Sequence, residues 1–205
     1  MTHMKTTKAG RSAATRKALL SAGRKLFAER GYYDTFTNEI AETAGLTRGA
    51  LYHHFRQKED LFRAVYEDVE LELMQKITGS VFSTTDPRAS AWERLRRGIH
   101  AFLDHSLDPS VQRITLLDAP AVLGWEAWRE IDAKYGYGLL RAAIQAAIDE
   151  GSIDKQPAEP LAAFLFGGLI EAAMLIARAA DVEVARDESG QAVDRLLGGI
   201  KSATP

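Results

Sequence analysis

The chain has 205 residues, of which 46% are hydrophobic and 26% charged; this composition is typical of a soluble globular protein and excludes a fibrous or disordered chain. Cysteine is absent, which excludes disulfides and thiolate metal sites and is typical of the reducing cytoplasm. Residues 1–63 hold 12 Lys and Arg against 6 Asp and Glu, whereas the other 142 residues hold 14 against 22, so the N-terminal part presents either a solvated basic face or a surface for an anionic partner.

The N-terminal segment is predicted to be a flexible basic arm over residues 1–11, followed by a helix. Apolar side chains are nearly missing from the arm. From Ser12 to Arg30 the pattern changes to one apolar helical face, and Gly31 is expected to end this helix. The apolar face consists of Leu19, Ala22, Leu26 and Phe27.

The stretch from Thr37 to Phe55 has the pattern of two short helices joined by a tight turn. Thr37 is expected to cap the first helix, and Gly45 to supply the left-handed backbone of the turn. Thr47 then caps a second helix that runs through His54. This pattern predicts a helix-turn-helix inside a DNA-binding domain of residues 12–63; two surface helices joined by a glycine are the alternative.

The remaining residues, 64–205, are predicted to form a second helical domain. No strand-like alternation occurs, so the fold class is all-α. A helix from Lys58 to Ile77 is long enough to bridge the domains, and the boundary loop is expected over residues 79–88. Further helices are expected over residues 90–107, 108–118, 125–150, 157–180 and 188–200, with a bend at residues 120–124. The apolar run 161–180 contains glycines and charges, so we interpret it as a buried helix and expect no membrane span.

The run from Gly31 to Phe62 resembles the DNA-binding domain of tetracycline-repressor (TetR) family regulators. It reads G-Y-Y-D-T-F-T, then I-A-E-T-A-G-L-T-R-G-A-L-Y-H-H-F, then K-E-D-L-F. Gln57 departs from the pattern, because a better capping residue often stands there in this family. The resemblance implies an all-helical homodimer whose N-terminal domains read a palindromic operator and whose C-terminal domains bind a small effector. It also implies a dimer interface built from the last two helices of each subunit.

DNA contacts are predicted chiefly from the second helix of the motif, because its N-terminal side chains enter the major groove. Arg48 can donate two hydrogen bonds to a guanine, and Thr47 can contact a phosphate or a thymine methyl. The family resemblance adds Tyr52 and the residue after it. The full set of predicted contacts is Thr37, Thr47, Arg48, Gly49, Tyr52, His53, His54 and Lys58. Solvent exposure without DNA contact is the alternative for each, and for His54 a place in the core is another.

An effector pocket is predicted among the helices between Ser90 and Met174. Its candidate residues are His100, Phe102, His105, Trp125, Trp128, Tyr135, Phe164 and Glu171. For each aromatic, a place in a packed core is the favoured alternative. Glu171 stands alone in an apolar run and is either a pocket anchor or half of an interface ion pair. His100 and His105 are five residues apart and do not share a helical face, so no metal site is expected.

No catalytic motif, phosphate loop or cofactor fingerprint is present in the sequence, so neither enzymatic activity nor a cofactor is expected. The sequence therefore predicts a cytoplasmic, dimeric, DNA-binding transcriptional regulator, most readily a repressor released by a small molecule. Two alternatives stay open: a constitutive or architectural DNA binder without effector, and an all-helical enzyme that uses the same cavity.

Overall fold

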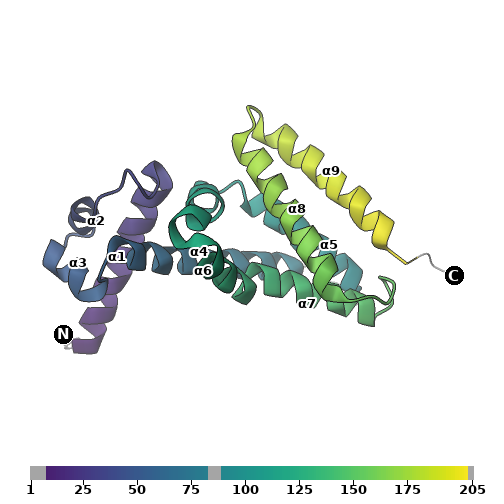
Figure 1. Cartoon of the computed structure of the whole chain (residues 1–205), viewed down its shortest axis with the longest axis horizontal. Helices are drawn as coiled ribbons and strands as arrows, with labels where there is room; N and C mark the ends of the chain where they lie inside the picture. Colours follow the sequence, from purple (N-terminus) through teal and green to yellow (C-terminus); the bar gives the residue numbers. More distant parts are fainter. Residues whose placement is uncertain (1–7, 83–88, 203–205) are drawn as a thin grey trace, which may run out of the picture.

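The computed structural model describes residues 8–82 and 89–202, and these residues are helical apart from turns and one isolated bridge between Ile153 and Lys201. The predicted all-α class is confirmed. A small N-terminal domain lies at one end of the molecule and a larger helical domain at the other (Figure 1).

The N-terminal domain consists of α1 (Lys8–Arg30), α2 (Thr37–Thr43) and α3 (Arg48–His54). Helix α1 already begins at Lys8, so the predicted arm is wrong for residues 8–11; residues 1–7 lie outside the described part. Lys8, Ala9 and Arg11 have good helix propensity, so the helix extends past Ser12 toward the N-terminus. Leu19, Phe27, Ile40, Leu51 and Phe62 are fully buried together and form the centre of this domain.

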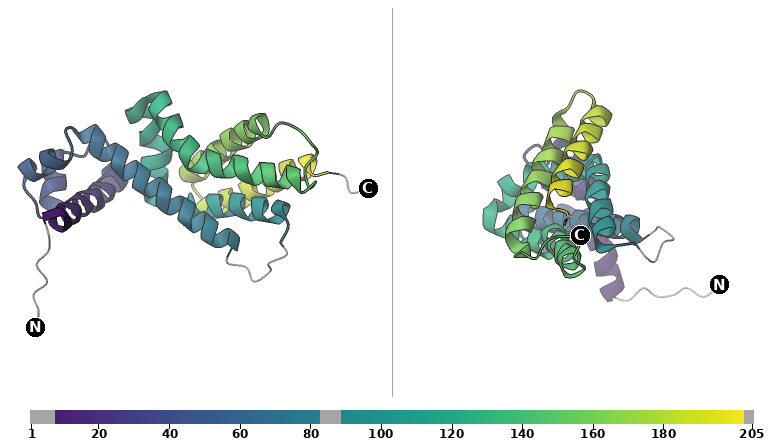
Figure 2. Two further views of the ribbon diagram at one scale, coloured as in Figure 1. Left: turned by 90° about the horizontal axis from the view of Figure 1, so that it is seen from below. Right: turned by 90° about the vertical axis from the view of Figure 1, so that its right-hand side faces the viewer.

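Helix α4 (Lys58–Phe82) joins the two domains. Its first turns pack against the N-terminal domain, and its later turns run along the C-terminal domain (Figure 2). It continues past the predicted end at Ile77, so residues 79–82 are helical and not loop; residues 83–88 lie outside the described part. The helix continues because Val81 packs on Gly98 of the neighbouring helix and gives the last turn a tertiary contact.

The C-terminal domain contains six further helical segments, which include one of π type. They are α5 (Ala91–His105), η1 (Val111–Asp118), α6 (Ala119–Lys134), α7 (Gly136–Asp149), α8 (Ala158–Arg178) and α9 (Val182–Ile200). Ser90 caps α5 by accepting a hydrogen bond from the Glu93 amide at 3.1 Å. The bend predicted at residues 120–124 is confined to Gly124, whose φ of 75° interrupts the helical backbone of α6.

Two predicted helices differ from the structure. The long helix 125–150 is divided at Tyr135, whose ψ of −94° is not helical. A Cβ at Gly138 would lie 2.5 Å from the Ala133 carbonyl oxygen, so the chain can turn this closely only because glycine stands there. Helix α9 begins at Val182 and not near residue 188, because Asp181 caps it by accepting a hydrogen bond from the Val184 amide at 3.1 Å.

Helices α8 and α9 lie side by side on the outer face of the C-terminal domain (Figure 1). By length and composition alone α8 could cross a membrane, and only 28% of its most apolar window is buried. The prediction of a buried helix is therefore wrong for one face of α8 in the single chain. This face carries exposed apolar side chains, of which Phe164 is 83% exposed.

Candidate DNA-binding and ligand-binding sites

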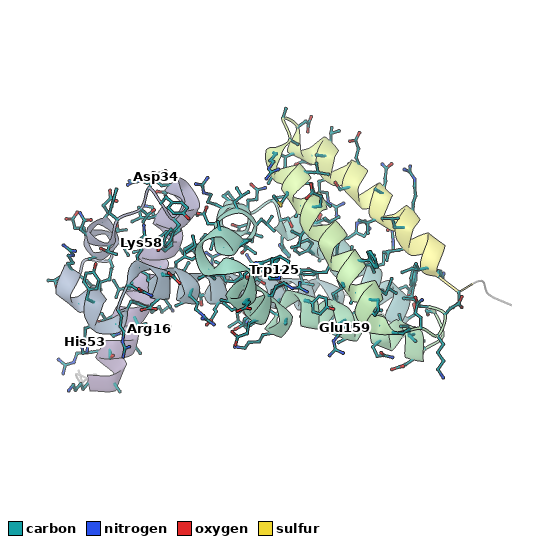
Figure 3. All side chains as sticks on the ribbon, in the orientation of Figure 1. Arg16, Asp34, His53, Lys58, Trp125 and Glu159 are labelled. Atoms are coloured by element: carbon teal, nitrogen blue, oxygen red, sulfur yellow. The ribbon has the colours of Figure 1, made fainter. Side chains whose placement is uncertain are left out.

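Helix α3 is fixed by its cap and by one buried side chain. The Thr47 hydroxyl accepts a hydrogen bond from the Ala50 amide at 3.2 Å, which confirms the predicted cap. Leu51 is fully buried and anchors the inner face of the helix. The outer face is exposed and carries Thr47, Arg48, Gly49, Tyr52 and His53. Five of the eight predicted DNA-contacting residues therefore lie on one accessible surface, and Figure 3 shows His53 at the end of the molecule farthest from the C-terminal domain.

Tyr52 is held in place by its neighbours. Its hydroxyl lies 3.3 Å from the Thr37 hydroxyl, and the Arg48 guanidinium lies 5.4 Å from the centre of its ring. The hydrogen bond to Thr37 and the nearby Arg48 lower the pKa of Tyr52 below its usual value. Thr37 thus connects α2 to the outer face of α3.

The predicted cap at Thr37 is wrong by one residue. Phe36 takes the capping position, and its amide donates to the Glu39 carboxylate at 3.1 Å. Thr37 is the first helical residue, which leaves its hydroxyl free to reach Tyr52. The sequence did not settle this point because either residue can adopt the extended backbone of a cap.

Lys58 and His54, like Thr37, are less accessible than the five exposed contacts. The Lys58 ammonium donates to the carbonyl oxygens of Tyr32 and Thr35 at 2.8 and 3.0 Å, and it lies 4.0 Å from the centre of the Tyr32 ring. Partial burial lowers the pKa of Lys58. In this structure Lys58 closes the turn between α1 and α2, and a phosphate contact through its remaining hydrogen stays a prediction.

Removal of the Thr47 cap is expected to weaken the N-terminal domain. Thr47→Ala leaves the Ala50 amide without its partner and should lower the free energy of unfolding by about 0.5–2 kcal/mol. Urea denaturation followed by circular dichroism measures this change. Thr47→Ser keeps the hydroxyl and should remain within about 0.5 kcal/mol of the wild type; equal stability of the alanine and serine variants would contradict the capping role.

The C-terminal domain contains a partly open cavity of about 730 Å³ between α4, α5, η1, α6, α7 and α8. Cavities of this size hold drug-sized ligands. Its walls are mostly apolar and include Leu73, Met74, Ile77, Leu95, Ile99, Phe102, Leu116, Trp125, Trp128, Leu140, Phe166 and Ile170. The domain is therefore not a fully packed helical core.

Three of the eight predicted pocket residues, Phe102, Trp125 and Trp128, line this cavity. The other five lie outside it: His100, His105, Tyr135, Phe164 and Glu171. Phe164 and Glu171 fall on the exposed face of α8, and Tyr135 stands at the break between α6 and α7.

His100 belongs to a charged contact between α5 and α9. Its Nε2 lies 2.9 Å from Oδ1 of Asp194, which also accepts two hydrogen bonds of 2.7 Å from Arg96. The Arg96 guanidinium and His100 hold the pKa of Asp194 well below its usual value. His100 therefore ties α5 to α9 and does not anchor a ligand in the cavity. In the described part of the chain, no group of three acidic or histidine side chains is placed to hold a metal ion.

One end of the cavity is polar, and this polar end was not predicted from the sequence. Glu70 of α4 and Asp132 of α6 line the cavity and are only 3% and 4% exposed. Burial, together with the nearby Asp132, raises the pKa of Glu70 to about 8, and burial raises the pKa of Asp132 to about 7. Glu70 lies four residues after the buried Tyr66 and three before the buried Leu73. A carboxylate on the apolar face of a helix was the pattern that could have revealed this site.

Several polar atoms near this end have no partner in good hydrogen-bond geometry in the described part of the chain, although Trp128 lies near Tyr66 and Thr115 near Glu70. They are the Tyr66 hydroxyl, the Thr115 hydroxyl and the Trp128 indole nitrogen. Thr115 and Trp128 line the cavity. Because leaving a buried polar group unpaired costs about 1–3 kcal/mol, this arrangement can supply hydrogen bonds to a molecule inside the cavity.

The wall of the cavity also contacts the DNA-binding domain. Segment η1 contributes Thr115 and Leu116 to the cavity and ends at the buried Asp118. The Asp118 carboxylate accepts a hydrogen bond of 2.7 Å from the Tyr32 amide, in the turn after α1, and lies 3.4 Å from Nε of Arg113. One short segment thus joins the cavity to the base of the helix-turn-helix.

Both domains match known protein families. Residues 19–65 match the model of bacterial regulatory proteins of the tetR family, and residues 92–200 match the tetracyclin repressor-like C-terminal domain. The chain is 34% identical to a TetR-family transcriptional regulator from Pectobacterium atrosepticum; the crystal structure of that protein superposes with a TM-score of 0.80 and covers 97% of this chain and 100% of the other.

More distant relatives agree with this placement. The TetC protein of transposon Tn10 from Escherichia coli is 26% identical over 92% of both chains. The FadR regulator of Bacillus subtilis, solved in complex with stearoyl-CoA, shares the fold at 19% identity and a TM-score of 0.68, over 85% of this chain and 95% of the other. The family consists of regulators and not of enzymes. The match of both domains, together with the exposed helix-turn-helix, leads to one conclusion: this chain belongs to the TetR family of DNA-binding transcriptional regulators.

Proposed function

We propose that this protein is a homodimeric repressor that leaves a palindromic operator when a small molecule enters the C-terminal cavity. The observation that carries the proposal is the placement of η1, which lines the cavity with Thr115 and Leu116 and holds the Tyr32 amide through Asp118. A change in the cavity wall can therefore alter the orientation of the DNA-binding domain.

In this proposal α3 enters the major groove. Arg48 donates to a guanine, while Thr47, Gly49, Tyr52 and His53 lie against neighbouring bases or phosphates. Thr37 and Lys58 approach the flanking phosphates, and His54 completes the surface. The exposed outer face of α3 supports this arrangement. Operator binding would also place the protein with the DNA in the bacterial cytoplasm.

The proposed dimer uses α8 and α9, as the family resemblance implies. Phe164 and Leu175 of α8 and Leu196 of α9 are exposed large apolar residues in the single chain. In the sequence of α8, Gly167 and Gly168 lie between Phe164 and Leu175, and the absence of side chains there allows a partner helix to approach closely. A second copy would remove this apolar surface from water and would set two α3 helices about 34 Å apart, one turn of DNA.

The cavity favours an effector-controlled regulator over a constitutive DNA binder, because a constitutive binder needs no internal space. A volume of about 730 Å³ with mostly apolar walls suits an elongated or planar apolar molecule. The FadR regulator of the same fold is solved with stearoyl-CoA, whose acyl chain is an elongated apolar group of this kind.

Operator binding is tested by fluorescence anisotropy on a labelled duplex from the gene's own upstream region and on a scrambled duplex. We expect tight binding to the native duplex alone, weakening steeply as salt is raised. Equal and weak binding to both duplexes at every salt concentration would count against sequence-specific recognition by this protein.

The Asp118 contact gives a separate prediction. Asp118→Ala leaves the Tyr32 amide without its partner and removes the carboxylate beside Arg113. We therefore expect the effect of a bound ligand on operator affinity to be at least fivefold smaller, a loss of about 1 kcal/mol of coupling free energy. Ligand affinity itself should change by less than about threefold, because Asp118 does not line the cavity. Anisotropy titrations with and without ligand measure both quantities.

Asp104→Ala is the matched control for this variant. It also removes a carboxylate from an ion pair, but the partner is Arg186 of α9 and not a residue of the DNA-binding domain. If ligand still lowers the operator affinity of Asp118→Ala as much as that of the wild type, the Asp118 contact does not couple the two sites. An equal loss of coupling in Asp104→Ala would lead to the same conclusion.

A further inference from the structure

We propose that the polar end of the cavity binds the protonated amino group of an elongated apolar effector, with Glu70 as the principal counter-charge. This inference rests on the proposed effector role of the cavity and names the chemical class of the effector. The ligand is a lipophilic amine: its chain or rings fill the apolar walls, and its ammonium group lies between Glu70 and Asp132.

Glu70 is a buried carboxylate without a cationic partner. In residues 8–82 and 89–202 it forms no ion pair, whereas Asp132 lies 3.4 Å from Nη1 of Arg129. The charged group that acts on Glu70 is Asp132, which is also an acid. A buried acid with only another acid as neighbour is destabilising unless something supplies positive charge or a proton.

The groups around Glu70 match an ammonium ion in their number and type. An ammonium has three N–H donors, and the two carboxylates with the Thr115 hydroxyl can accept all three. Thr115 faces the Glu70 carboxyl and is 6% exposed. Its hydroxyl oxygen has two lone pairs, so it can accept a hydrogen bond from a ligand while it contacts Glu70. It is therefore available to a ligand inside the cavity.

The aromatic wall beside this end already holds one cation. The Arg129 guanidinium lies 5.6 Å from the ring centre of Trp125, 5.9 Å from that of Trp128 and 5.7 Å from that of Phe166. All three rings also line the cavity. Aromatic faces attract cations, but Arg129 already occupies these faces and its charge repels a second cation. The rings therefore supply the apolar wall of this end, and the preference for a charged ligand comes from Glu70.

An acidic ligand is the competing possibility, because Arg94 and Arg178 also line the cavity. Arg94 donates to the Ala89 carbonyl oxygen, and Arg178 is exposed to solvent at the end of α8. A pair with an exposed arginine is screened by water and adds little affinity. Glu70 is buried, so a pair with Glu70 gains more.

The proposal also sets the sign of the pH dependence. The groups that face Glu70 are Tyr66 on its own helix, Thr115 of η1 and Asp132 of α6. Arg129 is paired with Asp132. Because the pKa of Glu70 is raised to about 8, its carboxyl is mostly protonated at pH 6 and becomes ionised above pH 8. An alkylamine stays protonated to about pH 10. Amine affinity should therefore rise from pH 6 to pH 8.5.

The test compares three probes of equal chain length, dodecylamine, dodecan-1-ol and dodecanoate, by isothermal titration calorimetry on the full chain below their micellar concentrations. We expect the amine to bind at least about tenfold more tightly than the other two at pH 8, a difference of about 1.4 kcal/mol. Only the amine should show affinity that rises with pH.

Variants assign the preference to one carboxylate. Glu70→Gln keeps the shape and should bring the amine within about twofold of the alcohol, while alcohol affinity stays as in the wild type. Asp68→Asn removes an exposed carboxylate from the same helix and should leave the amine preference unchanged. Unchanged alcohol binding in Glu70→Gln also shows that the variant is folded.

The outcomes separate this inference from the effector role itself. Tighter binding of dodecanoate or dodecanol, or an amine preference that survives Glu70→Gln, would overturn the amine inference while leaving an effector cavity in place. Binding of none of the three probes would overturn it as well, and operator binding without ligand would still test the regulator independently.

Discussion

Replacement of Arg48 by alanine is expected to lower the affinity for the native operator by about 30-fold or more and to abolish the preference for it over a scrambled duplex. The physical reason is the loss of two hydrogen bonds to a guanine, worth about 1–3 kcal/mol at each half-site. Two subunits lose them together in a dimer, so the effect is about 2–6 kcal/mol per operator. The side chain is exposed at the start of α3, so the fold should not change.

Arg141→Ala is the matched control for Arg48→Ala. Arg141 is also exposed, but it lies on α7 and pairs at 3.7 Å with Glu159, away from the DNA-binding domain. It should bind the operator as the wild type does. An Arg48→Ala variant that still prefers the native duplex would show that α3 does not read the operator through this residue.

Replacement of Phe164 by aspartate is expected to convert the dimer to a monomer. Phe164 is 83% exposed in the single chain, and the proposed interface would bury it twice, once from each subunit. Placing a carboxylate there costs several kcal/mol per dimer, so the dimer dissociation constant should rise by at least about 100-fold. Operator affinity should fall in parallel, because one subunit contacts only one half-site.

Sedimentation equilibrium measures the dissociation constant, and anisotropy measures operator binding on the same samples. Leu71→Asp is the control, because Leu71 is an exposed apolar residue of α4 outside α8 and α9. It should remain dimeric. A dimeric Phe164→Asp variant, or dissociation of the control to the same extent, would rule out this face as the interface.

The helix-turn-helix could be predicted because its determinants are local. Thr47 caps α3 through an amide three residues away, and Gly45 takes a φ of 68° in the turn. Leu51 is buried at the helical spacing expected from the pattern. Such features depend on neighbours in sequence, which a single sequence displays.

The cavity could not be predicted in the same way, because it depends on which face each helix turns inward. Glu171 stood out in an apolar run, but it shares the exposed face of α8 with Phe164 and Leu175. Glu70 was less conspicuous in a charged helix, yet it is the carboxylate that faces the cavity. The composition of a run does not reveal its buried side when that side is fixed by contacts between distant helices.

Helix ends in the C-terminal domain were missed for a related reason. The break at Tyr135 depends on the close approach of Gly138 to the Ala133 carbonyl oxygen, and the contact of Asp118 with the Tyr32 amide joins residues 86 positions apart. Neither is visible as periodicity. The contacts that link the cavity to the DNA-binding domain could therefore be identified only in the three-dimensional structure.

If a ligand in the cavity releases the operator, then ligand and operator must each lower the affinity of the protein for the other. Measuring both effects tests this antagonism most directly. The measurement is the affinity of a cavity-bound dodecyl probe with and without saturating operator, beside the operator affinity with and without saturating probe. We expect both affinities to fall by the same factor, about tenfold or more. A probe that binds in the cavity and leaves operator affinity unchanged, with the operator likewise leaving probe affinity unchanged, would contradict the account.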